Sequence, residues 1–145
     1  MLTGGCFCGE IRYELHDALG LVANCHCAFC RRIHGAPYTT ISLVRADDIR
    51  WVGAEPCVYE TPLGYRRHFC PSCAAPSCNF PPVAVSVGEF ASVVIGSLDD
   101  DWQQRAWFHV NVESRLPWVD VDDGLPAFEG WPAPWRIREL AVGSE

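Results

Sequence analysis

Seven of the nine cysteines in this 145-residue sequence fall into three short clusters. Two of the clusters are pairs, and two thiolates that lie two or three residues apart on a tight turn can reach one tetrahedral metal ion. Two such pairs complete the four-sulfur coordination of a structural zinc site. We therefore predict a closed zinc site from Cys6 and Cys8 together with Cys70 and Cys73.

The middle cluster has three cysteines within six residues, Cys25, Cys27 and Cys30. No fourth cysteine has a comparable spacing, so the simplest count gives three protein ligands and one free position. A catalytic zinc keeps such a position for water or substrate, which predicts a second, open site. In the alternative interpretation Cys57, Cys78 or a histidine closes this site, and all the cysteines only hold loops together.

The side chains near these clusters have less specific patterns. Cys57 lies in an alternating segment and is expected to be a buried small hydrophobic residue. Cys78 lies in a proline-rich segment, where a cysteine without a special role is favoured over an alternative ligand or a redox-sensitive thiol. His26 separates two predicted ligands, and neighbours in an extended turn point apart, so we expect its ring beside the site rather than on the ion.

The composition fits one globular domain, covering residues 1–145. The sequence has neither a signal-peptide pattern nor an apolar stretch long enough to span a membrane, so we expect a cytoplasmic protein. A reducing cytosol disfavours disulfides and favours the use of cysteines as metal ligands. The formal net charge of −7 argues against nucleic acid as a partner, and the oligomeric state is left open.

Short segments rich in β-branched and aromatic residues predict a mostly β fold. Helix is expected only as single turns, at residues 28–33 and 45–48. Prolines after Cys70 predict a tight loop, and the Pro and Trp residues after Gly124 predict an irregular strap packed by aromatic rings. The predicted strands are residues 10–15, 19–24, 38–44, 49–52, 57–61, 65–69, 83–87, 92–95 and 107–112.

The order and spacing of several motifs resemble one known family, the glutathione-dependent formaldehyde-activating enzymes and centromere protein V. The resemblance extends from Thr3 to about Phe128. It rests on the stretch from Gly4-Gly5-Cys6-Phe7-Cys8-Gly9 to Tyr13, on Cys25-His26-Cys27-Ala28-Phe29-Cys30-Arg31-Arg32, on Phe69-Cys70-Pro71-Ser72-Cys73, and further along on Gly96-Ser97-Leu98-Asp99, His109-Val110, Arg115, Trp118 and Asp123-Gly124-Leu125-Pro126.

This resemblance implies a compact, zinc-stabilised β fold of small antiparallel sheets and a carbon–sulfur lyase activity. The family reaction adds the thiol of glutathione to formaldehyde and gives S-hydroxymethylglutathione. We expect the open zinc to take the glutathione sulfur as its fourth ligand and so to deprotonate it. The resemblance also assigns the ligands: Cys6, Cys8, Cys70 and Cys73 for a structural zinc, and Cys25, Cys27 and Cys30 for a more labile catalytic zinc.

One departure from the family concerns the turn after the last cysteine pair. The family usually has a glycine there, whereas Ala74 follows Cys73 in this sequence. Because a glycine at such a place often adopts a left-handed conformation, we expect either a different turn or a strained one.

Glutathione carries two carboxylates, so an acidic protein needs local cations to bind it. Arg31 and Arg32 directly follow the open cluster and are the best candidates, since the guanidinium group suits carboxylates. Weaker candidates are Arg66, Arg67 and Arg115, and for all five a solvated surface charge is an equal alternative. By its family position, His109 is expected to be either a proton shuttle near the open site or a structural histidine.

Two other functions are compatible with the sequence. In the first, both zinc ions are structural, and the protein is a zinc-scaffolded binding module whose aromatic surface docks a partner without catalysis. In the second, the cysteines serve thiol redox chemistry or metal buffering.

Overall fold

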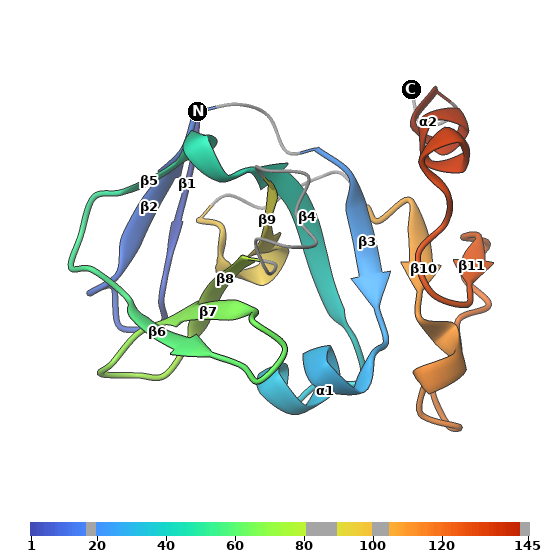
Figure 1. Ribbon diagram of the computed structural model, residues 1–145, viewed down its shortest axis with the longest axis horizontal. Helices are drawn as coiled ribbons and strands as arrows, with labels where there is room; N and C mark the ends of the chain where they lie inside the picture. Colours follow the sequence, from blue (N-terminus) through green and yellow to red (C-terminus); the bar gives the residue numbers. More distant parts are fainter. Residues whose placement is uncertain (17–19, 81–89, 100–104, 143–145) are drawn as a thin grey trace. The chain divides into compact units, whose positions relative to one another are not determined.

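The computed structural model describes residues 1–16, 20–80, 90–99 and 105–142 (Figure 1). The chain forms two compact units, and each unit is built from two separate stretches of sequence. The first unit contains Met1–Gly20 and Ser42–Gln103, and the second contains Leu21–Ile41 and Gln104–Glu145. The single domain expected over residues 1–145 stays a prediction.

Three short antiparallel strands form a small sheet in the first unit, in the order β1 (Leu2–Gly5), β2 (Arg12–Leu15) and β5 (Ile49–Trp51). Alternate residues of a strand point to opposite faces, so Tyr13 and Leu15 of β2 both face the interior and are almost fully buried. The core that they form with their neighbours contains Tyr13, Leu15, Val44, Ala91 and Val93.

Four further antiparallel strands of the first unit are neighbours in the order β6 (Cys57–Glu60), β7 (Arg66–Phe69), β8 (Pro76–Phe80) and β9 (Phe90–Val94). The register between β7 and β8 shifts at His68 and Phe69, just before the turn that carries Cys70. Such an irregularity bends a strand locally. Here it leads the chain out of the ladder and into the last cysteine pair.

The second unit is built on parallel strands, with β10 (Phe108–Val110) between β11 (Ala127–Phe128) and β3 (Val22–Cys25). Every residue of β3 and β10 is buried, as is typical of parallel strands. Two helices, α1 (Ala28–His34) and α2 (Pro134–Val142), belong to the same unit. Ile137 and Leu140, three residues apart on α2, both pack against the core around Phe108.

The mostly β class is confirmed, and the predicted strands within the described residues are present with ends that differ by a few positions. The strand expected at residues 83–87 lies outside the described residues. The expected helical turns correspond to α1 and to a 3-10 turn at Ala46–Asp48, and further 3-10 turns lie at Ile95–Ser97 and Val112–Ser114. β4 (Thr39–Arg45) begins in the second unit and ends in the first.

Three expectations are wrong. The prolines after Cys70 do not keep the whole segment in a loop, because Pro76 is the first residue of β8, where a strand tolerates a missing N–H. Helix is not confined to single turns, because Pro134 starts α2 inside the expected strap, and its fixed φ suits a first helical turn. Cys57 is exposed, like every other residue of β6. None of the described helices is long and apolar enough to cross a membrane.

Candidate metal centres

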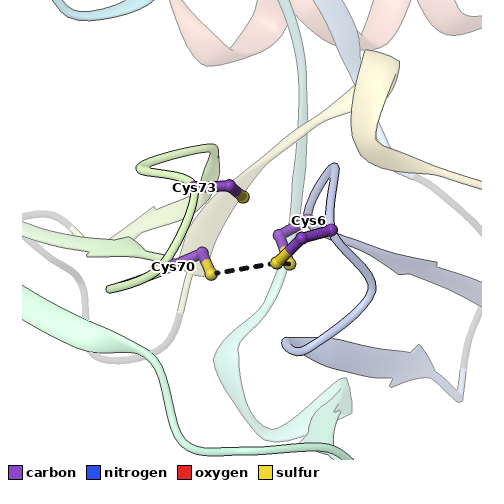
Figure 2. A group of neighbouring side chains, drawn as sticks. Cys6, Cys70 and Cys73 are labelled. Carbon is purple, nitrogen blue, oxygen red and sulfur yellow. Dashed lines mark hydrogen bonds between the residues drawn. The ribbon is translucent and has the colours of Figure 1, made fainter.

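The sulfurs of Cys6, Cys8, Cys70 and Cys73 lie within 4.8 Å of one another in the first unit. Two turns supply them, one after β1 and the other between β7 and β8. Figure 2 shows the side chains of Cys6, Cys70 and Cys73 converging from these turns. All four are free thiols, and Cys70 is completely buried. This closed group could hold one metal ion with four sulfur ligands.

In both turns the residue after the second cysteine has a positive φ. Gly9 follows Cys8 with a φ of +82°, and Ala74 follows Cys73 with a φ of +58°. The N–H groups of Gly9 and Ala74 each donate to the carbonyl of the first cysteine in their own turn, at 3.1 and 2.9 Å. The alanine therefore does not change the turn but strains it, because a left-handed backbone costs an L-residue ~1–2 kcal/mol.

Hydrogen bonds to the sulfurs favour their charged form. The backbone N–H of Ile11 donates to the sulfur of Cys6 at 3.2 Å. Although burial acts in the opposite direction, this bond and the neighbouring thiols lower the pKa of Cys6. The backbone N–H of Ala75 similarly helps to lower the pKa of Cys73 to about 6.

The closed group nevertheless cannot carry four negative charges without a cation. The N–H of Glu10 favours the thiolate of Cys8, but contacts with the sulfurs of Cys6, Cys73 and Cys70, together with partial desolvation, outweigh it and raise the pKa of Cys8 to about 12. Cys8 lies 3.5 Å from the Cys6 sulfur and 3.7 Å from that of Cys70. A coordinated thiol is deprotonated outright, so a zinc ion would remove this conflict. The four-sulfur donor set fits zinc.

The sulfurs of Cys25, Cys27 and Cys30 form the open group in the second unit, also within 4.8 Å of one another. Cys25 ends β3, and Cys27 is the N-cap of α1, whose first turn carries Cys30. Cys25 and Cys30 are buried, and Cys27 is partly exposed. Among the described residues no fourth Cys, His, Asp or Glu belongs to this group. The side chain of Cys78 is outside the described part of the chain.

The contacts within the open group favour the thiolate form of Cys27 and disfavour that of Cys25 and Cys30. Contacts with the sulfurs of Cys25 and Cys30 lower the pKa of Cys27 to about 2, and the N–H of Cys30 also donates to it at 3.3 Å. The same contacts raise the pKa values of Cys25 and Cys30. A divalent, thiophilic ion would allow all three to ionise, so this donor set also fits zinc, with one position left for another ligand.

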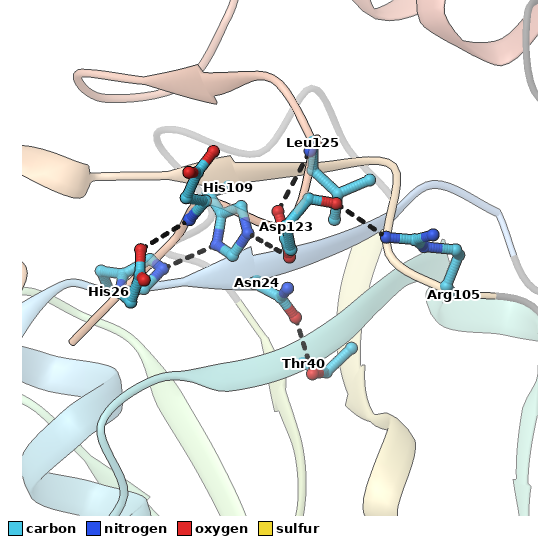
Figure 3. Close-up of polar contacts among 9 residues, drawn as sticks. Asn24, His26, Thr40, Arg105, His109, Asp123 and Leu125 are labelled. Carbon is cyan, nitrogen blue, oxygen red and sulfur yellow. Dashed lines mark hydrogen bonds and ion pairs between the residues drawn. The ribbon is translucent and has the colours of Figure 1, made fainter.

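A chain of hydrogen bonds runs from a histidine in the cysteine loop to the protein surface. His26, which separates the first two cysteines of the group, bonds through Nε2 to Nδ1 of His109 at 2.8 Å, and Nε2 of His109 bonds to Asp123 at 3.0 Å (Figure 3). Both rings are buried, whereas the Asp123 side chain is 42% exposed. The parallel pairing of β3 with β10 brings these residues together from distant parts of the sequence.

This arrangement defines which ring nitrogens carry protons. A carboxylate only accepts hydrogen bonds, so in a neutral His109 ring Nε2 carries the proton and Nδ1 accepts from His26. Burial, followed by the nearby His109, lowers the pKa of His26 to about 4, and the ring is neutral at neutral pH. Its Nδ1 is then an unprotonated acceptor, buried and without a hydrogen-bond partner among the described residues. His26 thus lies beside the sulfurs and is not a member of their group.

The predicted cations lie in different places. Arg31 and Arg32 are on α1 directly after Cys30, and the Nε of Arg31 donates to the backbone carbonyl of His26 at 3.4 Å. Arg32 is exposed. Arg115 is exposed in the same unit, whereas Arg66 and Arg67 belong to β7 of the first unit.

Two contacts of the second unit are not revealed by the sequence. The side-chain amide of Asn111 donates to the sulfur of Cys25 at 3.2 Å, and Asp123 accepts from His109. The available signals are weak. Asn111 lies inside the predicted strand 107–112, so the only signal for its conformation is the tolerance of asparagine for a left-handed backbone. Asp123 followed by Gly124 indicates a turn.

Comparisons with known proteins agree with this architecture. A family model described as glutathione-dependent formaldehyde-activating enzyme matches residues 1–114, a range that contains both cysteine groups. A crystal structure of a Rhodobacter sphaeroides protein has a similar fold, with a TM-score of 0.53 and 22% sequence identity over 87% of this chain and 99% of that chain. No curated protein matches the sequence significantly.

Proposed function

Because the chain belongs to the family of glutathione-dependent formaldehyde-activating enzymes, we propose that it is a zinc-dependent carbon–sulfur lyase. Its substrates would be a small thiol, glutathione, and formaldehyde or a related electrophile. The observation that carries the proposal is the open group, in which three sulfurs converge without a fourth protein ligand among the described residues. The closed group would have a purely structural role.

The reaction forms one carbon–sulfur bond and is redox-neutral. The thiolate sulfur attacks the carbonyl carbon, the π pair of the C=O bond moves to oxygen, and the oxygen takes up a proton equivalent to the one that the thiol lost. A free thiol is only a few per cent ionised at neutral pH, which limits this addition. A zinc ion held by Cys25, Cys27 and Cys30 would supply a fourth position that binds the substrate thiol as its thiolate.

Two arginines on α1 would recognise glutathione. Arg31 and Arg32 follow Cys30 in the same helix, so their side chains start next to the open group. The planar guanidinium group forms paired hydrogen bonds with a carboxylate. Because Arg31 already holds the backbone carbonyl of His26 through Nε, we assign the first carboxylate contact to the exposed Arg32.

His109 would act as a positioning residue rather than as a proton shuttle that touches substrate. Both of its ring nitrogens already have partners, Asp123 on one side and His26 on the other. The ring is also buried. The carboxylate fixes the protonation of His109, and His109 in turn fixes the orientation of His26 in the cysteine loop. His109 therefore influences the open group only through His26.

Cobalt substitution tests the proposed open position. A mild chelator should remove the more labile ion, and one equivalent of cobalt should then report on the open group while zinc stays in the closed group. We expect sulfur-to-cobalt charge-transfer bands typical of three sulfurs, and stronger bands after glutathione is added. A four-sulfur spectrum before any thiol is added, unchanged on titration with glutathione, would rule out the lyase.

Replacing Arg31 and Arg32 by Ala separates recognition of glutathione from coordination of its sulfur. Loss of the carboxylate contacts should weaken glutathione binding by ~1–3 kcal/mol, whereas the binding of mercaptoethanol, an uncharged thiol, should hardly change. Arg50→Ala removes an exposed positive charge from β5 of the first unit and is the control for net charge. Equal weakening of both thiols would contradict a carboxylate-binding role.

Exposed tryptophans favour a second candidate function, a zinc-scaffolded binding module. Trp118, Trp131 and Trp135 of the second unit are 72%, 42% and 59% exposed. Tryptophan is enriched in protein interfaces, so these side chains suit a docking surface. Under this alternative both ions are structural, and the cobalt spectrum of the open group would not respond to glutathione.

A further inference from the structure

The three sulfurs of the open group receive different hydrogen bonds. The sulfur of Cys25 accepts from the side-chain amide of Asn111 at 3.2 Å, and the backbone N–H of Cys27 also favours its thiolate. The sulfur of Cys27 accepts from the backbone N–H of Cys30 at 3.3 Å, a bond that is part of the start of α1. For the sulfur of Cys30, no N–H donor is found in the described part of the chain. Among these three sulfurs, only that of Cys25 thus accepts a hydrogen bond from a side chain that is distant in the sequence.

Asn111 has a backbone conformation that residues other than glycine rarely adopt. Its φ of 56° and ψ of 39° are left-handed, and among the described non-glycine residues only Ala74 also has a positive φ. Asparagine tolerates this region better than most residues. Two backbone bonds hold it in place, from Asn111 N–H to the carbonyl of Gly130 at 3.2 Å and from Ser114 N–H to the carbonyl of Asn111 at 3.1 Å.

The strand pairing explains how this conformation directs the side-chain amide of Asn111 toward Cys25. Val110 pairs with Cys25 in the parallel ladder of β10 and β3, so Asn111 is the first residue beyond the pairing. The chain leaves the strand there through the left-handed residue instead of continuing extended. A strained residue that its surroundings hold in place, with its polar group on a predicted metal ligand, is the kind of outlier that indicates function.

We propose that Asn111 is a positioning residue that withdraws charge from the Cys25 thiolate and so protects this metal ligand from the electrophilic substrate. A site for thiol addition to an aldehyde has a selectivity problem, because its own thiolates are also nucleophiles. A hydrogen bond to a thiolate stabilises the charge, and nucleophilicity falls as the basicity of the sulfur falls. The inference rests on the proposed function for the metal at Cys25 and for the electrophile, whereas the withdrawal of charge from Cys25 can be measured without either substrate.

The variant Asn111→Gly tests this idea with little disturbance of the backbone, because glycine adopts the left-handed conformation freely. In zinc-loaded protein, iodoacetamide should alkylate Cys25 roughly five- to tenfold faster than in the wild type. Peptide mass spectrometry at short reaction times gives a rate for each cysteine, so Cys27 and Cys30 are internal controls with unchanged rates. In cobalt-loaded protein the charge-transfer band should move to lower energy, because a more electron-rich sulfur gives up its electron more readily.

A second variant and the pattern of rates decide the outcome. Asn111→Asp keeps the size of the side chain but replaces the donor by a carboxylate. It should therefore raise the alkylation rate of Cys25 and lower the charge-transfer energy by more than Asn111→Gly does. An unchanged Cys25 rate with an unchanged charge-transfer energy in Asn111→Gly would overturn the inference. Equal acceleration at all three cysteines would also overturn it, because that indicates a loosened loop. A selective effect on Cys25 in a protein that does not respond to glutathione would refute the lyase but keep the withdrawal of charge from Cys25 by Asn111.

Discussion

Replacing Ala74 by glycine should stabilise the protein. Ala74 is exposed, and its φ of +58° costs ~1–2 kcal/mol in the folded state, a cost that glycine does not have. Glycine also has more freedom in the unfolded chain, which lowers the free energy of unfolding by ~0.4–1 kcal/mol. The two effects predict a net stabilisation of about 0.5–1 kcal/mol, or a rise of about 2–4 °C in melting temperature.

Urea denaturation at a fixed concentration of free zinc measures this change, because bound zinc adds to the apparent stability by mass action. Competition with a chromophoric chelator should also show tighter zinc binding, since the strain lies in a turn that carries two of the ligands. Ala54→Gly is the matched control. Ala54 is an exposed alanine of the same unit without a positive φ, so its replacement should cost ~0.4–1 kcal/mol.

The reverse substitution in the first turn provides an independent check. Gly9 has a φ of +82° and open space around it, so Gly9→Ala should introduce backbone strain without a steric clash. We expect a loss of ~1 kcal/mol from the left-handed backbone. If Ala74→Gly were destabilised as much as Ala54→Gly, the strain argument for the closed group would be refuted.

Three further predictions concern the two groups and one ion pair. Cys73→Ser should abolish soluble folded protein, because zinc binding at the closed group is largely folding free energy; a variant with native-like melting temperature and full zinc content would contradict this. Cys27→Ser should keep the fold and contain one zinc per chain by elemental analysis, whereas release of both ions from the wild type in one step with unfolding would argue against an open group. Arg12, with help from Thr3, lowers the pKa of Asp99 to about 2. The stability from this pair is therefore complete above the ordinary carboxyl pKa of ~3.9 and is lost as the pH falls toward 2. Asp99→Asn should cost ~0.5 kcal/mol by urea denaturation at pH 7 and at pH 5 alike. The cost should become smaller below pH ~3.9, and an unchanged cost at pH ~2 would contradict this linkage.

The cysteine groups are the part of the site that the sequence predicts best, because their spacing is local. Cys25, Cys27 and Cys30 need only the end of a strand and one helical turn to bring their sulfurs together. The alternation that buries Tyr13 and Leu15 is equally local, so β2 could be predicted from the pattern alone. In both cases nearest neighbours in the chain decide the geometry.

The features that the sequence does not predict depend on pairing between distant segments. The bond from His109 to His26 and the amide of Asn111 on Cys25 exist because β10 lies parallel to β3, and no local pattern encodes that pairing. Cys57 alternates with its neighbours as a half-buried strand would, but β6 is exposed on both faces. Two prolines expected in irregular segments instead begin β8 and α2, at positions where the missing N–H of proline is tolerated.

The two units alternate along the chain, and this gives the metal sites an order of assembly during synthesis. The closed group is complete as soon as Cys73 has left the ribosome. Cys25, Cys27 and Cys30 emerge earlier, but β10, Asn111 and His109 belong to the last stretch of the second unit. Contacts between such distant residues form slowly. The closed group can therefore be complete before Asn111 and His109 are available to support the three thiols of the open group.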